Sequence, residues 1–170
     1  LFRSVLATNT SSLSVTQIAE AVKKPERFVG MHFFNPVRYL HLLEIVPTPT
    51  TKPEIVAAMK KFGEERLGKG VVIGKDTTNF IANRIGVFSL LATLYHAKAM
   101  KLGLDEVDAL TGTLLGRPKS ATFRTMDVVG LDTMQHVVAT MEQQLSDDPW
   151  HNAFILPDWL KELIKQGHLG

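Results

Sequence analysis

A histidine and a glutamate that could act together on a hydroxyl group stand in two neighbouring apolar runs, at His32 and Glu44. The breaker Asn35-Pro36 separates the runs, which indicates two extended strands joined by a short connection. If the strands pair antiparallel around a bend centred on Arg38, both residues lie six positions from the centre and face each other directly. The spacing therefore predicts an imidazole beside a carboxylate.

Such a pair has a clear chemical use. A carboxylate that accepts from one ring nitrogen fixes the tautomer and favours the protonated ring, so the other nitrogen can take a proton from a substrate hydroxyl. A second interpretation stays open, because His32 would share a strand face with Phe28 and Phe34. In that case His32 is a core histidine that the carboxylate satisfies.

Two further groups of polar residues could bind a ligand. Ser11 and Ser12 follow the apolar run of residues 4–7, and open α/β sheets bind ligands at the carboxyl ends of strands. One of these hydroxyls could instead cap the helix that follows. Asn83 falls one turn into a long apolar helix, where its amide could bind a polar substrate or the helix end.

The elements that position these residues alternate between strand and helix up to about Gly74. Strands are predicted at residues 4–7, 27–34, 41–46 and 71–73, the last of them short and buried. Helices are predicted at residues 15–22, with Ser14 and Gln17 as a capping box, and from Pro53 to about Leu67. This alternation is typical of part of a doubly wound sheet.

From Lys75–Asp76 onward the pattern becomes helical. We expect four helices here. The first has an apolar face made of Ile81, Ile85, Phe88, Leu91 and Tyr95, and the second has one made of Leu104, Val107 and Leu110. The third covers residues 128–145, and a short final helix covers residues 150–163. The sequence thus predicts an α/β domain at residues 1–75 and an all-helical domain at residues 76–170.

Composition excludes several classes of protein. The 19 Lys and Arg residues are scattered against 17 Asp and Glu, so we expect no nucleic-acid partner. The longest apolar stretch, residues 80–100, carries charged and amide side chains that a bilayer would oppose, so we expect no membrane span. The six histidines are dispersed, which predicts no metal site. The absence of cysteine permits a reducing compartment, and we expect the cytoplasm.

Four blocks occur in order along the chain: NTSSLSVTQIA, RFVGMHFFNPVRYLHLLEIV, KDTTNFIANRIG and DVVGLDT. Together they resemble the 3-hydroxyacyl-CoA dehydrogenases of fatty-acid β-oxidation, and GRPKSATFRTMDVVGLDT is similar in particular to their bacterial multifunctional branch. The resemblance implies the C-terminal part of a Rossmann-type NAD-binding domain, followed by a helical domain through which two copies form a homodimer. It also implies NAD-dependent oxidation of L-3-hydroxyacyl-CoA to 3-ketoacyl-CoA.

The resemblance implies a role for each matching residue. His32, in the HFFNP motif, would be the base, and Glu44 would hold it and favour its protonated form. Ser11 and Asn83 would bind the substrate. The residues implied at the cofactor are Asn9 and Asn35.

The chain also departs from the family pattern. The glycine-rich turn and the acidic residue that binds the adenosine ribose lie upstream of NTSS in the family and are missing here, so we interpret the chain, which opens at Leu1, as a piece of a longer protein that binds NAD poorly alone. Thr78-Asn79 stand where much of the family has Pro-Gly. Two other functions stay open: a related two-domain hydroxyacid dehydrogenase and a non-catalytic helical interaction module.

Overall fold

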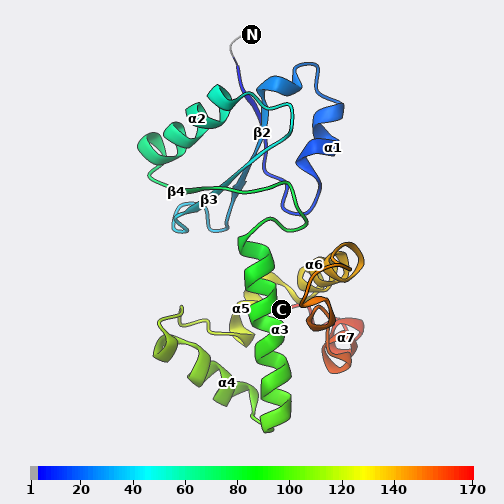
Figure 1. Ribbon diagram of the computed structural model, residues 1–170. Helices are drawn as coiled ribbons and strands as arrows, with labels where there is room; N and C mark the ends of the chain where they lie inside the picture. Colours follow the sequence, from blue (N-terminus) through cyan, green and yellow to red (C-terminus); the bar gives the residue numbers. More distant parts are fainter. Residues whose placement is uncertain (1–3) are drawn as a thin grey trace. The chain divides into compact units, whose positions relative to one another are not determined.

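The computed structural model describes residues 4–170, and the chain divides into two compact units that meet in the sequence between Ala82 and Asn83 (Figure 1). The first unit is an α/β sheet structure and the second is helical, which confirms the predicted fold class. Among the described residues, we find no helix with both the length and the apolar character needed to cross a bilayer.

The first unit is built on a four-stranded sheet with the order β1-β2-β3-β4. The strands are β1 (Leu6–Thr8), β2 (Phe28–Phe33), β3 (Leu42–Pro47) and β4 (Gly70–Ile73). β1 runs parallel to β2, β2 antiparallel to β3, and β3 parallel to β4. The helical segments are α1 (Val15–Glu20), the 3₁₀ turn η1 (Pro25–Arg27), α2 (Pro53–Lys61) and the π-helical turn η2 (Phe62–Arg66).

The register of β2 on β3 places His32 directly opposite Glu44, as the symmetry about Arg38 predicted. The alternation of the strands fixes this register, because a slip of one residue would turn every side chain to the other face. Val29, Met31, Leu43 and Ile45 form the face that packs against side chains of α2, including Val56 and Met59. His32 and Glu44 therefore lie on the opposite face.

Helix α1 covers the face that carries His32. Its Val15 and Ala19 pack with Phe28 and Val46 in one buried cluster. Gly30 is required for this close approach, since a Cβ there would lie 3.0 Å from both a Val15 methyl group and the Val46 Cβ. The small residue between Phe28 and His32 thus lets the helix lie directly on the sheet.

Strand β4 corrects one expectation. Residues 71–73 were predicted to be buried, but Val72 and Ile73 are 42% and 44% exposed. β4 is the last strand in the sheet order and has a neighbour on one side only. Its apolar residues therefore mark an edge strand.

A long-range contact holds the beginning of α1. Ser14 accepts from the N–H of Gln17, which is half of the predicted capping box. The remaining donors go to Asp76, which accepts from the Ser14 hydroxyl at 2.8 Å and from the N–H groups of Val15 at 3.0 Å and Thr16 at 2.7 Å. Burial would raise the pKa of Asp76, but these hydrogen bonds from Thr16, Ser14 and Val15 outweigh it and hold the pKa below its ordinary value.

We predict that Asp76→Asn lowers the free energy of unfolding by about 1–2 kcal/mol at neutral pH, since an amide has one acceptor oxygen for three donors. A carboxylate whose pKa is lowered on folding stabilises the protein above its unfolded-state pKa and loses that contribution as the pH falls through the folded-state value. Urea unfolding at about pH 7 and about pH 2.5 should therefore show the difference shrinking in acid.

Asp158→Asn is the control for this measurement, because Asp158 also lies in the first turn of a helix but its side chain is fully exposed. We expect it to change stability by less than about 0.5 kcal/mol. Equal losses in both variants would show that Asp76 acts only through its charge at a helix start.

The second unit contains five α-helices and two 3₁₀ turns within the described residues. They are α3 (Ala82–Met100), α4 (Leu104–Thr111), η3 (Thr113–Leu115), α5 (Phe123–Val129), α6 (Leu131–Gln144), η4 (His151–Ala153) and α7 (Asp158–Lys165). The helix predicted over residues 128–145 is interrupted at Gly130, whose φ of 95° ends α5 before α6 begins. Residues from α3, α5, α6 and α7 share one core.

Helix α3 buries part of the apolar face that the sequence predicted and leaves the rest exposed. Val87, Leu91 and Leu94 are buried in the core, whereas Ile85 and Tyr95 are 64% and 72% exposed. The helix is apolar around much of its circumference, so periodicity cannot select the face that packs. Helix α4 likewise buries Val107 and leaves its other predicted apolar residues exposed.

Candidate active site

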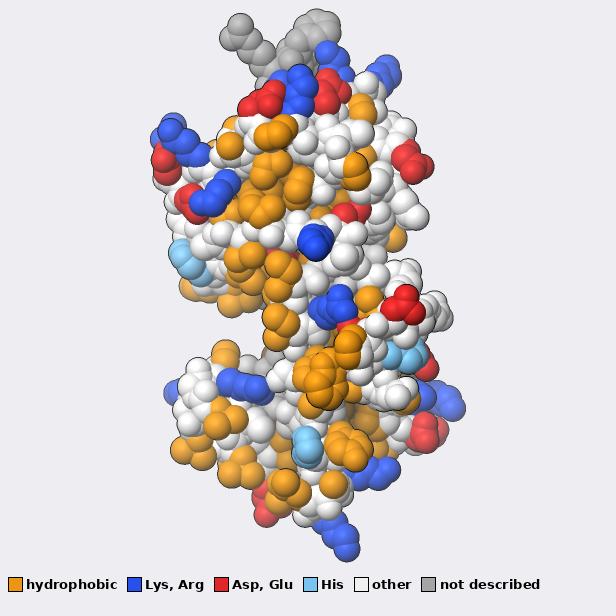
Figure 2. Space-filling view, in the orientation of Figure 1, with side chains coloured by type: hydrophobic (Ala, Val, Ile, Leu, Met, Phe, Trp, Pro, Cys, Tyr) orange, Lys and Arg blue, Asp and Glu red, His pale blue; other side chains and the backbone are white. Residues whose placement is uncertain are grey.

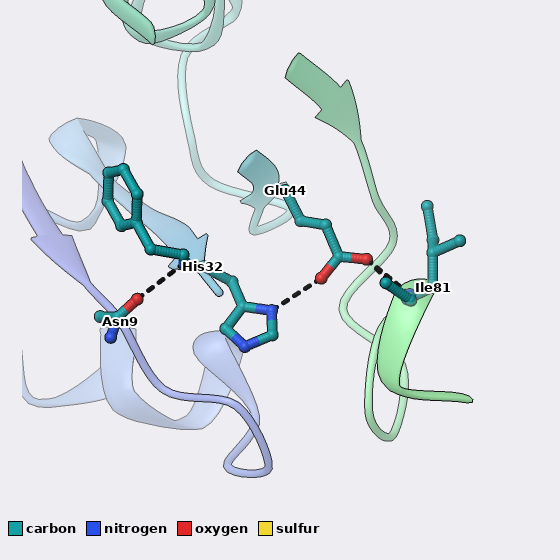
Figure 3. A network of polar contacts seen from close by, with 6 residues as sticks. Asn9, His32, Glu44 and Ile81 are labelled. Carbon is teal, nitrogen blue, oxygen red and sulfur yellow. Dashed lines mark hydrogen bonds and ion pairs between the residues drawn. The ribbon is translucent and has the colours of Figure 1, made fainter. Parts of the chain in front are cut away.

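The His32 ring lies against the Glu44 carboxylate, with 2.7 Å between Nδ1 and Oε2. Both residues are buried, at 4% and 0% exposure. Figure 3 shows the other ring nitrogen directed away from Glu44. Because the carboxylate can only accept, it places a proton on Nδ1 and leaves Nε2 of the neutral ring as an acceptor.

The second oxygen of Glu44 binds the start of helix α3. Its Oε1 accepts from the N–H groups of Ile81 at 3.0 Å and Ala82 at 2.8 Å (Figure 3). Burial would raise the pKa of Glu44, but hydrogen bonds from His32, Ala82 and Ile81 outweigh it and hold the pKa below its ordinary value. Glu44 is therefore ionised at neutral pH although no water reaches it.

Two aromatic rings flank His32. Its ring centroid lies 4.5 Å from that of Phe34 and 5.4 Å from that of Phe80, which meets it edge-on. They keep water from the imidazole and so strengthen its interaction with Glu44 in a medium of low dielectric.

The lowered pKa of Glu44 makes the free energy of unfolding depend on pH. Because its pKa is lowered on folding, it stabilises the protein above its unfolded-state pKa, and this contribution is lost as the pH falls through the folded-state value. We expect the free energy of unfolding of Glu44→Gln to fall less steeply than that of the wild type from about pH 5 to about pH 2. Parallel curves from denaturant titrations would contradict an ionised Glu44.

Ser11 and Ser12 lie in the exposed loop after β1. The helix cap is Ser14, so the alternative in which Ser11 or Ser12 caps α1 is wrong. Within the part of the chain that the structure describes, neither hydroxyl has a hydrogen-bond partner. Both are thus available to a ligand at the carboxyl end of a parallel strand.

The three asparagines of the predicted site differ in their surroundings. The Asn9 side-chain oxygen accepts from the Phe33 N–H at 2.9 Å and ties the end of β1 to the end of β2 (Figure 3). Asn35 is exposed and precedes a cis peptide bond to Pro36. Asn83 is the second residue of α3 and opens the helical unit, so its side chain belongs to that unit and not to the one that holds His32.

Two features of the site were not predicted as part of it from the sequence. The donors to Glu44 are backbone N–H groups, which any residue type provides except proline. Asn79 is 1% exposed, has a left-handed φ of 60°, and its carboxamide lacks a partner among the described residues. Asparagine tolerates this conformation better than other side chains do, which explains how it stands where much of the family has glycine.

Within residues 4–170 we find no cluster of three or more histidine or acidic side chains that could hold a metal ion.

Two family models match the sequence of the chain. Residues 3–77 match the NAD binding domain of 3-hydroxyacyl-CoA dehydrogenase, and residues 80–170, more than half of the chain, match its C-terminal domain.

Individual proteins agree with the family models. A probable 3-hydroxyacyl-CoA dehydrogenase of Bacillus subtilis is 47% identical over 98% of this chain and 21% of its own length. The crystal structure of FadB2 from Mycobacterium tuberculosis has a TM-score of 0.87 at 34% identity, over 98% of this chain and 57% of that one. For an (S)-3-hydroxybutyryl-CoA dehydrogenase from Ralstonia eutropha the TM-score is 0.85 at 28% identity, over 98% and 56%.

The chain thus spans between about a fifth and somewhat more than half of the length of these relatives. Its sequence matches both domain models in the expected order, and its first unit carries the buried histidine and glutamate on neighbouring strands. The chain belongs to the 3-hydroxyacyl-CoA dehydrogenase family.

Proposed function

We propose that the protein containing this chain is an NAD-dependent dehydrogenase that oxidises the L-3-hydroxyl group of an acyl-CoA to a 3-ketone. The observation that carries the proposal is the buried His32–Glu44 pair, whose second ring nitrogen is directed away from the acid. The family supports it, because the matching models describe a 3-hydroxyacyl-CoA dehydrogenase and its NAD binding domain.

In this reaction Nε2 of His32 takes the hydroxyl proton, and Glu44 stabilises the imidazolium that forms. NAD, when bound, supplies the acceptor for the hydride that leaves the same carbon. Ser11 and Asn83 bind the substrate oxygen and the groups near it. Since one proton goes to His32 and two electrons leave with the hydride, the alcohol carbon becomes a carbonyl carbon.

The residues present fit one end of the cofactor. The loops after β1 and β2 lie at the carboxyl ends of parallel strands and expose Ser11, Ser12 and Asn35, where α/β sheets bind nucleotides. We assign Asn9 and Asn35 to this nicotinamide end. The described residues contain no glycine-rich strand–turn–helix motif for the pyrophosphate, so tight binding of NAD needs further residues.

We also propose a homodimer formed through the helical unit. Figure 2 shows hydrophobic side chains on the visible surface of that unit. Its large exposed residues include Tyr95, Met100, Leu114, Leu115 and Trp150, each at least 63% exposed. Apolar surface of this kind is typical of interaction sites.

The wider setting is proposed on the same family relationship. We propose that the protein acts in the cytoplasm, in fatty-acid β-oxidation, and as part of a multifunctional enzyme, with its dehydrogenase domains dividing between residues 75 and 76. The relative in which this chain covers 21% of the length supports a parent with further domains.

The test is a comparison of substrates with the full-length protein. We expect it to oxidise NADH in the presence of acetoacetyl-CoA and to leave free acetoacetate unreduced. Turnover of small free keto acids instead would support a related hydroxyacid dehydrogenase, and no turnover of either would support the non-catalytic interaction module.

A further inference from the structure

Glu44 is shared between the predicted base and the beginning of a helix. One carboxylate oxygen lies 2.7 Å from His32 Nδ1, and the other accepts from the N–H groups of Ile81 and Ala82 at 3.0 and 2.8 Å. These three donors together hold the carboxylate in place. Figure 3 shows them on opposite sides of the Glu44 side chain.

The turn before α3 directs both N–H groups at one oxygen. Asn79 and Phe80 are two consecutive residues with positive φ, 60° and 49°. A side-chain-bearing residue in this region costs about 1–2 kcal/mol of backbone strain. The buried Phe80 side chain, which packs with Val15, Phe28 and Val46, holds the turn in place.

The charges around Glu44 are few. Glu44 faces His32 on β2, and its register partner on β4 is the apolar Val72. The segment 80–82 contacts the Glu44 carboxylate through backbone N–H groups. Among the described residues, His32 is therefore the titratable side chain that contacts Glu44. A change in the donors from α3 therefore reaches His32 through this carboxylate, and the Phe80 ring, 5.4 Å from the His32 ring, is a second contact between the two segments.

We propose that the N–H groups of Ile81 and Ala82 are positioning groups for the base: by binding one oxygen of Glu44, they set how strongly the other oxygen holds the proton on His32. The proposal rests on the proposed function of His32 as a general base. A carboxylate that shares its charge among three donors attracts the imidazolium proton less than one with a single donor. The two N–H groups thus limit how strongly Glu44 stabilises the imidazolium form of His32. The lowered pKa of Glu44 agrees with strong donation from both groups.

Proline tests one donor by itself. Ala82 is the first residue of α3, a position where helices accept proline because its N–H has no partner inside the helix. In the full-length protein, we expect Ala82→Pro to move the acid limb of the kcat/KM profile for L-3-hydroxyacyl-CoA oxidation to higher pH by roughly half a unit or more. Leu104→Pro, at the first residue of α4 and after an extended Gly103, is the control that leaves the profile unchanged.

A second readout is independent of turnover. Ring signals of [¹⁵N]histidine give the pH at which His32 is half protonated, whether or not the protein acts on acyl-CoA. This pH should rise in Ala82→Pro and stay at the wild-type value in Ala82→Gly, which alters the same side chain but keeps the N–H. Equal values in Ala82→Pro and Ala82→Gly would overturn the proposal, and an absence of dehydrogenase activity alone would overturn only the proposed function.

If Ala82→Pro does not fold, a measurement on the wild-type protein still tests the proposal. The amide proton signals of Ile81 and Ala82 should shift together with the His32 ring signals as the pH is changed, because both ends of the carboxylate respond to the same proton. Amide signals that stay constant through the histidine titration would overturn the proposal.

Discussion

Replacement of His32 by glutamine is expected to lower kcat for the reduction of acetoacetyl-CoA by about 10²–10⁴-fold, the usual contribution of a general acid or base. Glutamine can fill much of the space of the imidazole and bind Glu44 through its amide group, so the sheet keeps its register. It cannot carry a proton to or from the substrate oxygen near neutral pH. Steady-state kinetics and circular dichroism on the same preparation check both halves of this prediction.

His41→Gln is the matched control. His41 lies in the same unit just before β3 but is exposed, and it is no part of the pair. We expect its kcat to stay at the wild-type value. Burial and pairing to Glu44 are expected of His32 whether it is a base or a core histidine. If His32→Gln also kept kcat within about threefold of the wild-type value, His32 would be the core histidine of the alternative interpretation.

The pairing of His32 with Glu44 was predictable because it depends on local rules. Two apolar runs on either side of an Asn-Pro breaker form an antiparallel pair, and equal distances from Arg38 then define the partners. The exposed loop with Ser11 and Ser12 followed in the same way from a strand and a turn. Sequence spacing thus located the paired side chains and the exposed hydroxyl groups of the first unit.

Other features depend on contacts that spacing does not encode. Asp76 caps α1 from a position 62 residues beyond Ser14, and the donors to Glu44 are backbone groups whose direction is set by the turn at Asn79 and Phe80. The apolar face predicted for α3 packs in the core only in part, because the helix has apolar residues on several sides. Tertiary packing decides among such alternatives, and it leaves no periodic signal.

Glu44→Gln is the second substitution with a large expected effect, and its cause is the tautomer of His32. The glutamine oxygen can still accept from Ile81 and Ala82, which leaves the NH₂ group facing Nδ1. Nδ1 must then accept, so the neutral ring carries its proton on Nε2. A ring in this form donates toward the substrate and cannot take the hydroxyl proton, and we expect kcat for oxidation to fall by about 10²-fold or more.

The same substitution separates catalysis from folding. Glu44→Gln keeps an acceptor for the Ile81 and Ala82 N–H groups and a hydrogen bond to Nδ1, so we expect it to cost less than about 2 kcal/mol of unfolding free energy. Glu44→Ala leaves the imidazole and the two N–H groups without this partner and should cost about 3–5 kcal/mol. Because no enzyme variant changes the equilibrium constant, a variant that leaves the affinities for NAD and NADH unchanged must lower kcat/KM for the acyl-CoA by the same factor in both directions at a given pH. A folded Glu44→Gln protein that retains kcat within a few-fold of the wild-type value would contradict this prediction. It would show that the reaction does not depend on the His32 tautomer that the Glu44 carboxylate fixes.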